Sequence, residues 1–332
     1  MRRAGAEAPA LASAQAVKPA AGAQGTMIGV ERRTDDLPPR VVMSRSPQAR
    51  PAEMYLAQAT AAHPSERRVL ATMMFCDLRE STALAERLGP EGMVALLREY
   101  YALIDDCLHV EGGMLDKFIG DGIMAAFGVP VSGPNDEDRA VRAALAMTAA
   151  LRRWNAERAA RGLDVVEMGI GINTAIVVAG PLGSPRQITY TVTGAGVNLA
   201  ARLEKACKRF STAILIGEET VRRLKEQYPI RPIGTLARPG RRDPLAVYEL
   251  IADHAAAAYT DLPAAIAAFS RGVALRQQGR LEAAAAQFRA CLADNPADRC
   301  AALQLDACRL DGRLACRGSQ AMTPERDAAL QQ

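Results

Sequence analysis

The stretch that decides the fold is VLATMMFCDL, residues 69–78. Its apolar, β-prone run predicts a buried strand, and the polar residues after it predict a loop at the end of that strand. Asp77 therefore stands where a strand runs into a loop. Asp is common in ordinary turns, so this single carboxylate needs a second signal before it indicates a binding site.

The second signal is DKFIGDGIMAAFG, residues 116–128. It predicts a hairpin whose strands, 113–119 and 123–127, are joined by the turn Gly120-Asp121-Gly122. Asp77 and Asp121 would then meet at one end of a sheet. Oxygen ligands without His or Cys favour hard cations such as Mg²⁺ or Mn²⁺, which hold phosphates. A nucleoside triphosphate is the substrate class that fits this pair.

The rest of the pattern predicts an α+β fold. Strands alternate with helices in the order βααββαββαβαββ, which mixes hairpins with crossovers and predicts a mostly antiparallel sheet with helices on one face. Helices are predicted at 81–88, 91–109, 136–160, 196–208 and 218–227, and further strands at 165–179, 187–193, 212–216, 230–236 and 245–251.

A third pattern lies near the C-terminus. One set of small and apolar residues has the spacing of a tetratricopeptide repeat and predicts a helical hairpin that turns at residues 278–280. The set is Gly272, Gly279, Leu281, Ala284, Phe288 and Pro296. A plain Ala-rich hairpin is the alternative. One repeat cannot bury its own apolar face, so we expect a second pair beginning near Ala297, or a protein partner.

These patterns divide the chain into four parts. Composition and periodicity predict a poorly ordered segment at 1–65, a catalytic domain at 66–252, a repeat-like helical segment at 262–316 and a tail at 317–332. Met27 offers a second start position within the first part.

Composition excludes several functions. The 332 residues are 49% hydrophobic and 23% charged, with no uninterrupted apolar run long enough to span a membrane. Residues 1–68 hold 10 Lys and Arg against 6 Asp and Glu, which leaves 31 of each for the remainder. That neutral body argues against nucleic-acid binding. Seven scattered Cys and three His predict reduced thiols in a cytoplasmic protein rather than disulfides or a zinc site.

Three stretches resemble the class III adenylyl and guanylyl cyclases, in family order over residues 66–251. MMFCDLREST (73–82) is similar to their metal-binding strand and phosphate loop, and DKFIGDGIMAAFG to their second metal hairpin. MGIGINTAIVVAGPLGSPRQITYTVTGAGVNLAARLE (168–204) is similar to the segment that ends in their catalytic helix. The resemblance implies their ferredoxin-like sheet, two divalent metal ions and a head-to-tail homodimer with shared sites.

The resemblance also implies residue roles. Asp77, Asp121 and the carbonyl of Leu78 would bind the two Mg²⁺ or Mn²⁺ ions, and Arg241 corresponds to a basic residue that contacts the terminal phosphates. Backbone N–H groups just before the next helix would bind phosphates, as such helix starts generally do. The residues of this phosphate loop are Arg79, Glu80, Ser81 and Thr82.

Base selection and transition-state binding are assigned in the same way. Lys117 corresponds to the family's adenine-selecting lysine and Thr191 to its partner, whereas guanylyl cyclases typically have Glu and a small residue. Asn198 and Arg202 occupy the transition-state positions. They are four residues apart and so share one helix face, where Asn would orient the ribose and Arg would counter phosphate charge.

Two residues depart from the bacterial pattern. Ala195 replaces an Asp or Asn, which would remove a helix N-cap worth about 1 kcal/mol. Glu80 replaces a common Gly and adds negative charge beside the phosphate loop.

The sequence thus predicts an adenylyl cyclase that converts ATP into 3′,5′-cyclic AMP and pyrophosphate. Guanylyl cyclase is the first alternative, disfavoured by Lys117, and a diguanylate cyclase lacks its Gly-Gly-Asp/Glu-Glu-Phe motif here. The alternative from another class is a nucleotide-binding pseudoenzyme that acts as an interaction module through the helical segment.

Overall fold

A computed structural model describes residues 40–41, 66–184, 187–237 and 244–320. Most of the predicted N-terminal segment, residues 321–332 of the predicted tail, and Arg241 lie outside the described residues. Within them, no helix is long and apolar enough to cross a membrane.

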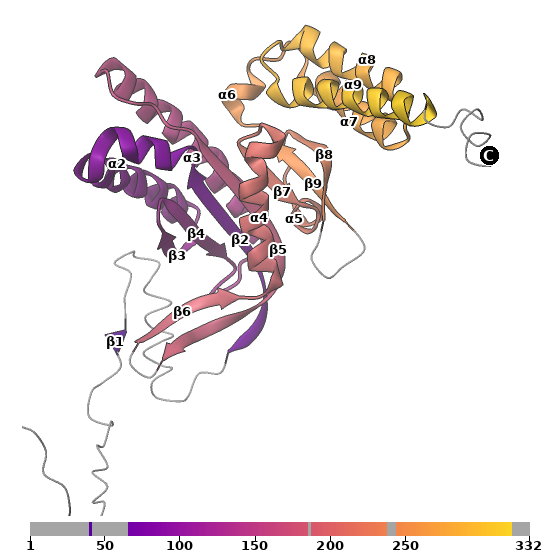
Figure 1. Cartoon of the computed structure of the whole chain (residues 1–332). Coiled ribbons are helices and arrows are strands. Elements are labelled where there is room, and N and C mark those ends of the chain that lie inside the picture. The colour runs from indigo at the N-terminus through magenta and orange to yellow at the C-terminus, as the bar shows by residue number, and fades with distance from the viewer. Residues whose placement is uncertain (1–39, 42–65, 185–186, 238–243, 321–332) are drawn as a thin grey trace, which may run out of the picture. The chain divides into compact units, whose positions relative to one another are not determined.

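A single twisted sheet organises the described part of the chain, in the order β3-β4-β2-β5-β7-β9-β8, with β6 beside β5 (Figure 1). Neighbouring strands are antiparallel except for the parallel pairs β5–β7 and β1–β6. The strands are β1 (Arg40–Val41), β2 (Arg67–Leu78), β3 (Met114–Ile119), β4 (Gly122–Phe127), β5 (Met168–Ser184), β6 (Gln187–Thr193), β7 (Ile214–Gly217), β8 (Ile230–Leu236) and β9 (Leu245–Leu250).

The helices follow the predicted order closely. The first, α2, bends at Gly89, whose φ is 68°, and Pro90 follows at once, so the two predicted helices are two arms of one kinked element. The helices are α2 (Ser81–Val110), α3 (Asp136–Ala160), α4 (Ala195–Phe210), α5 (Glu218–Arg223), α6 (Asp253–Ala256), α7 (Leu262–Gln277), α8 (Leu281–Asp294) and α9 (Arg299–Gln320).

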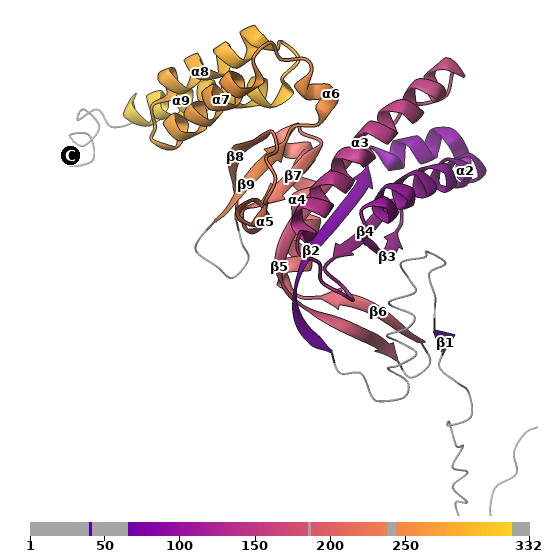
Figure 2. The same ribbon diagram turned by 180° about the vertical axis from the view of Figure 1, so that it is seen from behind.

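The prediction that the helices cover one face of the sheet is wrong. On β2, Met74 and Cys76 pack in the core beneath α2 and α3, whereas Met73 packs on the other face with Ala200 of α4. Alternation along the strand places these side chains on opposite faces. The two views in Figure 1 and Figure 2 show α4 and the α2–α3 pair on different sides of β2. Both faces of the sheet therefore carry helices.

The close approach of α4 to the sheet depends on small residues in β5. A Cβ atom added at Gly171 would lie 2.2 Å from the backbone N of Glu204, too close for any side chain. This glycine lets the helix that carries Asn198 and Arg202 rest directly on the strand beside β2.

The C-terminal helices form the predicted hairpin and a third helix. Helices α7 and α8 turn at Gly279, whose φ is 76°, and pack through an edge-to-face contact of Phe269 and Phe288 with ring centroids 5.3 Å apart. A Cβ atom at Gly272 would lie 2.7 Å from the Phe288 ring, which explains that glycine. The helices themselves are thus present, and their assignment to a tetratricopeptide repeat stays a prediction.

The helical segment shares a core with the sheet. Phe269, Phe288 and Cys300 belong to the same buried cluster as Val247 of β9 and Phe210 of α4. The hairpin therefore buries its apolar face against its own chain.

A buried ion-pair network fixes this junction. Arg231 of β8 donates to both carboxylate oxygens of Asp298 at 2.7 and 2.8 Å and to Glu249 of β9 at 2.6 Å. Asp298 also accepts a hydrogen bond from the Tyr259 hydroxyl at 2.9 Å. The Arg231 guanidinium lies 3.9 Å from the centre of the Phe269 ring, so every group in the network has partners.

Candidate active site

Two acidic side chains meet where β2 ends and the β3–β4 hairpin turns. Cys76 pairs with Ile123, which places Asp77 beside Gly122, and Asp121 precedes that glycine in the turn. A Cβ atom at Gly122 would lie 3.2 Å from Asp77 Oδ1. The two carboxylates thus lie close together, as the sequence predicts, and Gly122 leaves space beside them because it has no side chain.

One oxygen of each carboxylate has no hydrogen-bond partner. Asp77 Oδ1 and Asp121 Oδ2 are both buried without a hydrogen bond to any described residue. Burial, together with the hydrogen bond and charge of Asp121 and the charge of Glu204, raises the pKa of Asp77 to about 7. Buried acceptors left without donors are costly, so this pair is suited to a cation supplied from outside.

The donor set fits a hard divalent cation. Carboxylate oxygens at this position, with the Leu78 carbonyl next along the strand, are the ligands that Mg²⁺ and Mn²⁺ prefer. No group of three or more His, Cys, Asp or Glu side chains with metal-binding geometry occurs among the described residues. A cation at Asp77 and Asp121 would therefore need phosphate oxygens or water to complete its shell, as Mg²⁺ bound with a nucleotide ordinarily does.

The phosphate loop is only partly free to bind an anion. The backbone N–H of Arg79 donates to the Glu167 carbonyl at 2.8 Å, and the Arg79 guanidinium donates to the Thr212 carbonyl. The Arg79 N–H is thus already occupied in this structure, unlike the arrangement predicted from the sequence. Ser81 and Thr82 open helix α2, where the first N–H groups have no acceptor within the helix and remain available to phosphate.

Glu80, between these residues, has a left-handed backbone with φ 55° and ψ 29°. Glycine takes this conformation without strain, and other residues rarely do. The geometry thus gives a backbone reason for the glycine that the resemblance to bacterial cyclases implies at this position.

Lys117 and Thr191, predicted to select the base, are in direct contact. Lys117 Nζ donates to Thr191 Oγ1 at 2.9 Å, although the two residues lie on different strands, β3 and β6. Asp116, which the sequence analysis did not single out, joins them. Its Oδ2 accepts from the Thr191 hydroxyl at 2.9 Å and lies 2.7 Å from Lys117 Nζ.

Asn198 and Arg202 lie on helix α4 as predicted, and both line a hollow of about 430 Å³. Arg202 donates to the Ala237 carbonyl at 2.7 Å, and Asn198 is exposed. The N-cap of α4 is Gly194 rather than residue 195, so the expectation that Ala195 removes an N-cap is wrong.

The acidic pair makes no direct bond to the other predicted groups among the described residues. No hydrogen bond or ion pair joins Asp77 or Asp121 to the Lys117–Thr191 contact or to Arg202 there.

Glu204 is a further acid that the sequence analysis did not select. It lies two residues after Arg202 on α4, and burial raises its pKa, with the charge of Asp121 adding to the effect. Its position over Gly169, the β5 residue paired with Asp77, brings a third negative charge near the acidic pair.

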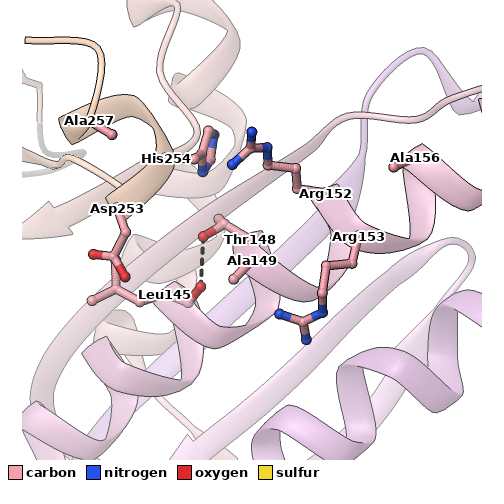
Figure 3. Close-up of a pocket in the computed structure, with 9 residues that line it drawn as sticks. All are labelled: Leu145, Thr148, Ala149, Arg152, Arg153, Ala156, Asp253, His254 and Ala257. Carbon is pink, nitrogen blue, oxygen red and sulfur yellow. Dashed lines mark hydrogen bonds between the residues drawn. The ribbon is translucent and has the colours of Figure 1, made fainter.

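A separate hollow lies along α3 and α6 (Figure 3). The Arg152 side chain points toward His254 there. None of the predicted metal, nucleotide or transition-state residues lines it. The lining residues are Leu145, Thr148, Ala149, Arg152, Arg153, Ala156, Asp253, His254 and Ala257.

Comparison with known proteins identifies relatives of the sheet domain. The profile of the family described as "Adenylate and Guanylate cyclase catalytic domain" matches residues 64–252, more than half of the chain. Adenylate cyclase 1 of Rhizobium meliloti is 33% identical over 180 residues, which cover 54% of this chain and 27% of that protein. The chain therefore corresponds to about a quarter of that relative.

Two solved structures are similar over the same region. The crystal structure of the guanylyl cyclase Cya2 is 35% identical with a TM-score of 0.53, covering 57% of this chain and 95% of the other. That of the adenylyl cyclase CyaB from P. aeruginosa is 33% identical with a TM-score of 0.53, covering 57% and 96%. These similarities confirm the α+β fold of the sheet domain, and they favour neither base over the other.

Proposed function

Because the chain belongs to the adenylate and guanylate cyclase catalytic domain family, we propose that it converts ATP into 3′,5′-cyclic AMP and pyrophosphate. The observation that carries the choice of ATP is the direct contact of Lys117 with Thr191. Lysine only donates hydrogen bonds, so it suits the N1 acceptor of adenine and opposes the N1–H of guanine. Guanylyl cyclase activity is the second candidate, because one of the two similar solved structures, Cya2, is a guanylyl cyclase.

The reaction is an in-line attack of the ribose 3′-oxygen on the α-phosphorus, with pyrophosphate leaving. Asp77, Asp121 and the Leu78 carbonyl would hold two divalent cations, which when bound lower the pKa of the 3′-hydroxyl and neutralise phosphate charge. The buried, unpartnered oxygens of the two carboxylates support this assignment. The free N–H groups of Ser81 and Thr82 would bind the phosphates at the start of α2.

Asn198 and Arg202 act on the other side of the nucleotide in this proposal. The exposed Asn198 orients the ribose, and Arg202 counters the negative charge that grows on the phosphate oxygens. Arg202 must exchange its bond to the Ala237 carbonyl for phosphate, or keep it and use its remaining donors. Arg241 would contact the terminal phosphates.

The active unit would be a head-to-tail homodimer. Asp77 and Asp121 of one chain would face Lys117, Thr191, Asn198 and Arg202 of the second chain, giving two shared sites. The unpartnered oxygens of the acidic pair and the exposed Asn198 leave these groups available to a nucleotide held between two chains. The interaction-module alternative rests on the helical segment alone, and it predicts nucleotide binding without turnover.

The product decides between these functions. Purified protein is incubated with ATP or GTP and with Mn²⁺ or Mg²⁺, and the products are separated by chromatography. Cyclic AMP as the main product supports the proposal. Cyclic GMP as the main product would support the guanylyl cyclase alternative. If neither nucleotide is converted, the result would favour the interaction-module alternative.

Mixing two inactive variants tests the shared sites. Asp77→Ala and Asn198→Ala each disable both sites of their own homodimer, whereas a heterodimer has one doubly altered site and one intact site. If chains exchange freely, about half of the dimers are heterodimers, so about a quarter of wild-type activity should return. No recovery, although light scattering shows heterodimers, would place all catalytic groups in one chain.

A further inference from the structure

The environment of Asp116 extends the base-selecting site beyond Lys117 and Thr191. Its side chain is 0% exposed, so it cannot contact a nucleotide directly. One carboxylate oxygen, Oδ2, bonds Thr191 and pairs with Lys117, while Oδ1 is buried without a partner. Burying a carboxylate oxygen without a hydrogen-bond donor lowers the stability of the fold. The presence of such a carboxylate beside Lys117 and Thr191 therefore suggests that it has a function there.

A β-bulge brings Asp116 to this position. Leu115 pairs with Ala125 and Lys117 pairs with Met124, so Asp116 is an extra residue that faces no partner on β4. In a regular strand, neighbouring side chains point to opposite faces. The bulge breaks this alternation and lets both Asp116 and Lys117 reach the same Thr191 hydroxyl, as bulges near functional sites often re-aim a side chain.

The hydrogen bonds determine which of these groups donates and which accepts. The only hydroxyl hydrogen of Thr191 is donated to Asp116, because a carboxylate can only accept. Thr191 is therefore held as an acceptor, toward Lys117 and toward any ligand. Lys117 has three N–H donors, two directed at Asp116 and Thr191, so one remains. The Lys117 side chain is 43% exposed, which leaves this donor accessible.

This polarity matches one base. Adenine presents an acceptor at N1 and a donor at its 6-amino group, which complement Lys117 as donor and Thr191 as acceptor. Guanine and hypoxanthine present N1–H and a 6-oxygen. The N1–H donor would then face the Lys117 donor, and the 6-oxygen acceptor would face the Thr191 acceptor. We propose that Asp116 is a positioning residue for base selection, which holds Thr191 as an acceptor and Lys117 as a donor. This inference rests on the proposed use of ATP.

The test compares ATP with inosine triphosphate, which differs from ATP along this edge and lacks the 2-amino group of guanine. The ratio of kcat/KM for the two nucleotides is measured with Mn²⁺ for wild type and for Asp116→Asn. An amide can donate to Thr191, which frees the hydroxyl hydrogen to turn toward the base. We expect the ATP preference to fall about 10- to 100-fold, with little change in Tm. A ratio that stays within about twofold of wild type, even if both activities fall, would overturn the proposal.

Two further variants identify the route. Thr191→Val removes the hydroxyl, and in the double variant the two changes should lower the ratio by less than the product of their separate effects, because they act through one contact. Independent effects that multiply would contradict the proposed route. Asp164→Asn is a matched carboxylate-to-amide change outside the base site, and it should leave the ratio unchanged.

The same experiment separates this inference from the proposed function. If wild type forms no cyclic nucleotide from either substrate, the proposed function fails, and the ratio is then taken from the dissociation constants of ATP and inosine triphosphate. If wild type prefers ATP and Asp116→Asn does not, the role of Asp116 is still supported. If the ratio of the two dissociation constants is the same in wild type and in Asp116→Asn, the role is overturned.

Discussion

Two groups of acids in this molecule, one buried and one half-buried, have opposite environments. At the junction of β8 and α9, Asp298 accepts two hydrogen bonds from Arg231 and one from Tyr259. At the end of β2, Asp77 faces Asp121, and each has a buried oxygen without any partner. Burial alone would raise the pKa of both acids. The Arg231 hydrogen bonds and charge lower the pKa of Asp298 below its usual value, whereas the pKa of Asp77 is raised.

The difference separates structure from function. A buried acid with complete partners fixes the position of the elements around it, here the helical segment against the sheet. Two neighbouring acids that each have an unpartnered oxygen lower the stability of the free chain, and a cation would remove that cost. The incomplete pair is therefore the place to expect a ligand, and the complete network is the place to expect loss of folding when one member is removed.

The largest expected effect is on activity at the incomplete pair. Asp77→Asn and Asp121→Asn should each lower cyclase turnover by about 10³-fold or more, because a metal ligand is lost. Without metal, Tm should stay equal or rise, since one of two repelling carboxylates is gone. Product assays and thermal melting measure the two effects. The exposed Asp253→Asn variant serves as a control, and near-normal turnover of both site variants would contradict the assignment.

Removing one member of the complete network should instead affect stability. Asp298→Ala leaves the buried guanidinium of Arg231 with Glu249 alone, and we expect a loss of about 3–5 kcal/mol in the free energy of unfolding. Denaturant unfolding measures this loss. A loss below about 1 kcal/mol for Asp298→Ala would show that the network does not hold the junction.

The two regions should also respond to pH in opposite directions. Asp77 has a raised pKa, so the folded chain binds more protons than the unfolded chain, and in metal-free protein its contribution to stability falls as pH rises from about 4 to 7. Asp298 has a lowered pKa, so its contribution is present above its unfolded pKa and is lost as pH falls through the folded value. Asp77→Asn should remove the first slope, and an identical pH profile for the variant would contradict this account.

The smallest expected effect concerns an exposed acid beside the incomplete pair. Glu80→Gly relieves a left-handed backbone and should raise stability by about 0.5–1 kcal/mol. Glu80→Gln keeps the strained backbone and removes the charge together with its exposed ion pair to Lys208, so it should lower the KM for ATP without raising Tm. Melting curves and KM values separate the two causes. A lower Tm for Glu80→Gly would show that Glu80 is not strained.

The sequence predicts the acidic pair well, because both positions follow from local patterns. Asp77 ends an apolar run and Asp121 lies in a Gly-Asp-Gly turn, and pairing of neighbouring strands then brings them together. The helix that carries Asn198 and Arg202 is also predicted within two residues at each end.

Other features depend on contacts that no local pattern encodes. The role of Asp116 depends on a bulge that interrupts strand alternation. The position of α4 on the second face depends on a close approach at Gly171. The merging of the helical segment with the sheet depends on Asp298 and Arg231, which are 67 residues apart and were not selected in the sequence. Long-range packing of this kind decides the parts that the sequence analysis missed or misplaced.

We expect a divalent cation, bound together with a nucleotide, to contact the unpartnered oxygens of Asp77 and Asp121. Mn²⁺ binding is measured by the electron paramagnetic resonance of free Mn²⁺, in the presence of 3′-deoxy-ATP, which cannot cyclise. Wild type should bind Mn²⁺, and Asp77→Asn and Asp121→Asn should each weaken binding by at least about tenfold, while Asp253→Asn should not. If both site variants bind Mn²⁺ as tightly as wild type, the acidic pair is not the metal site and the account is wrong.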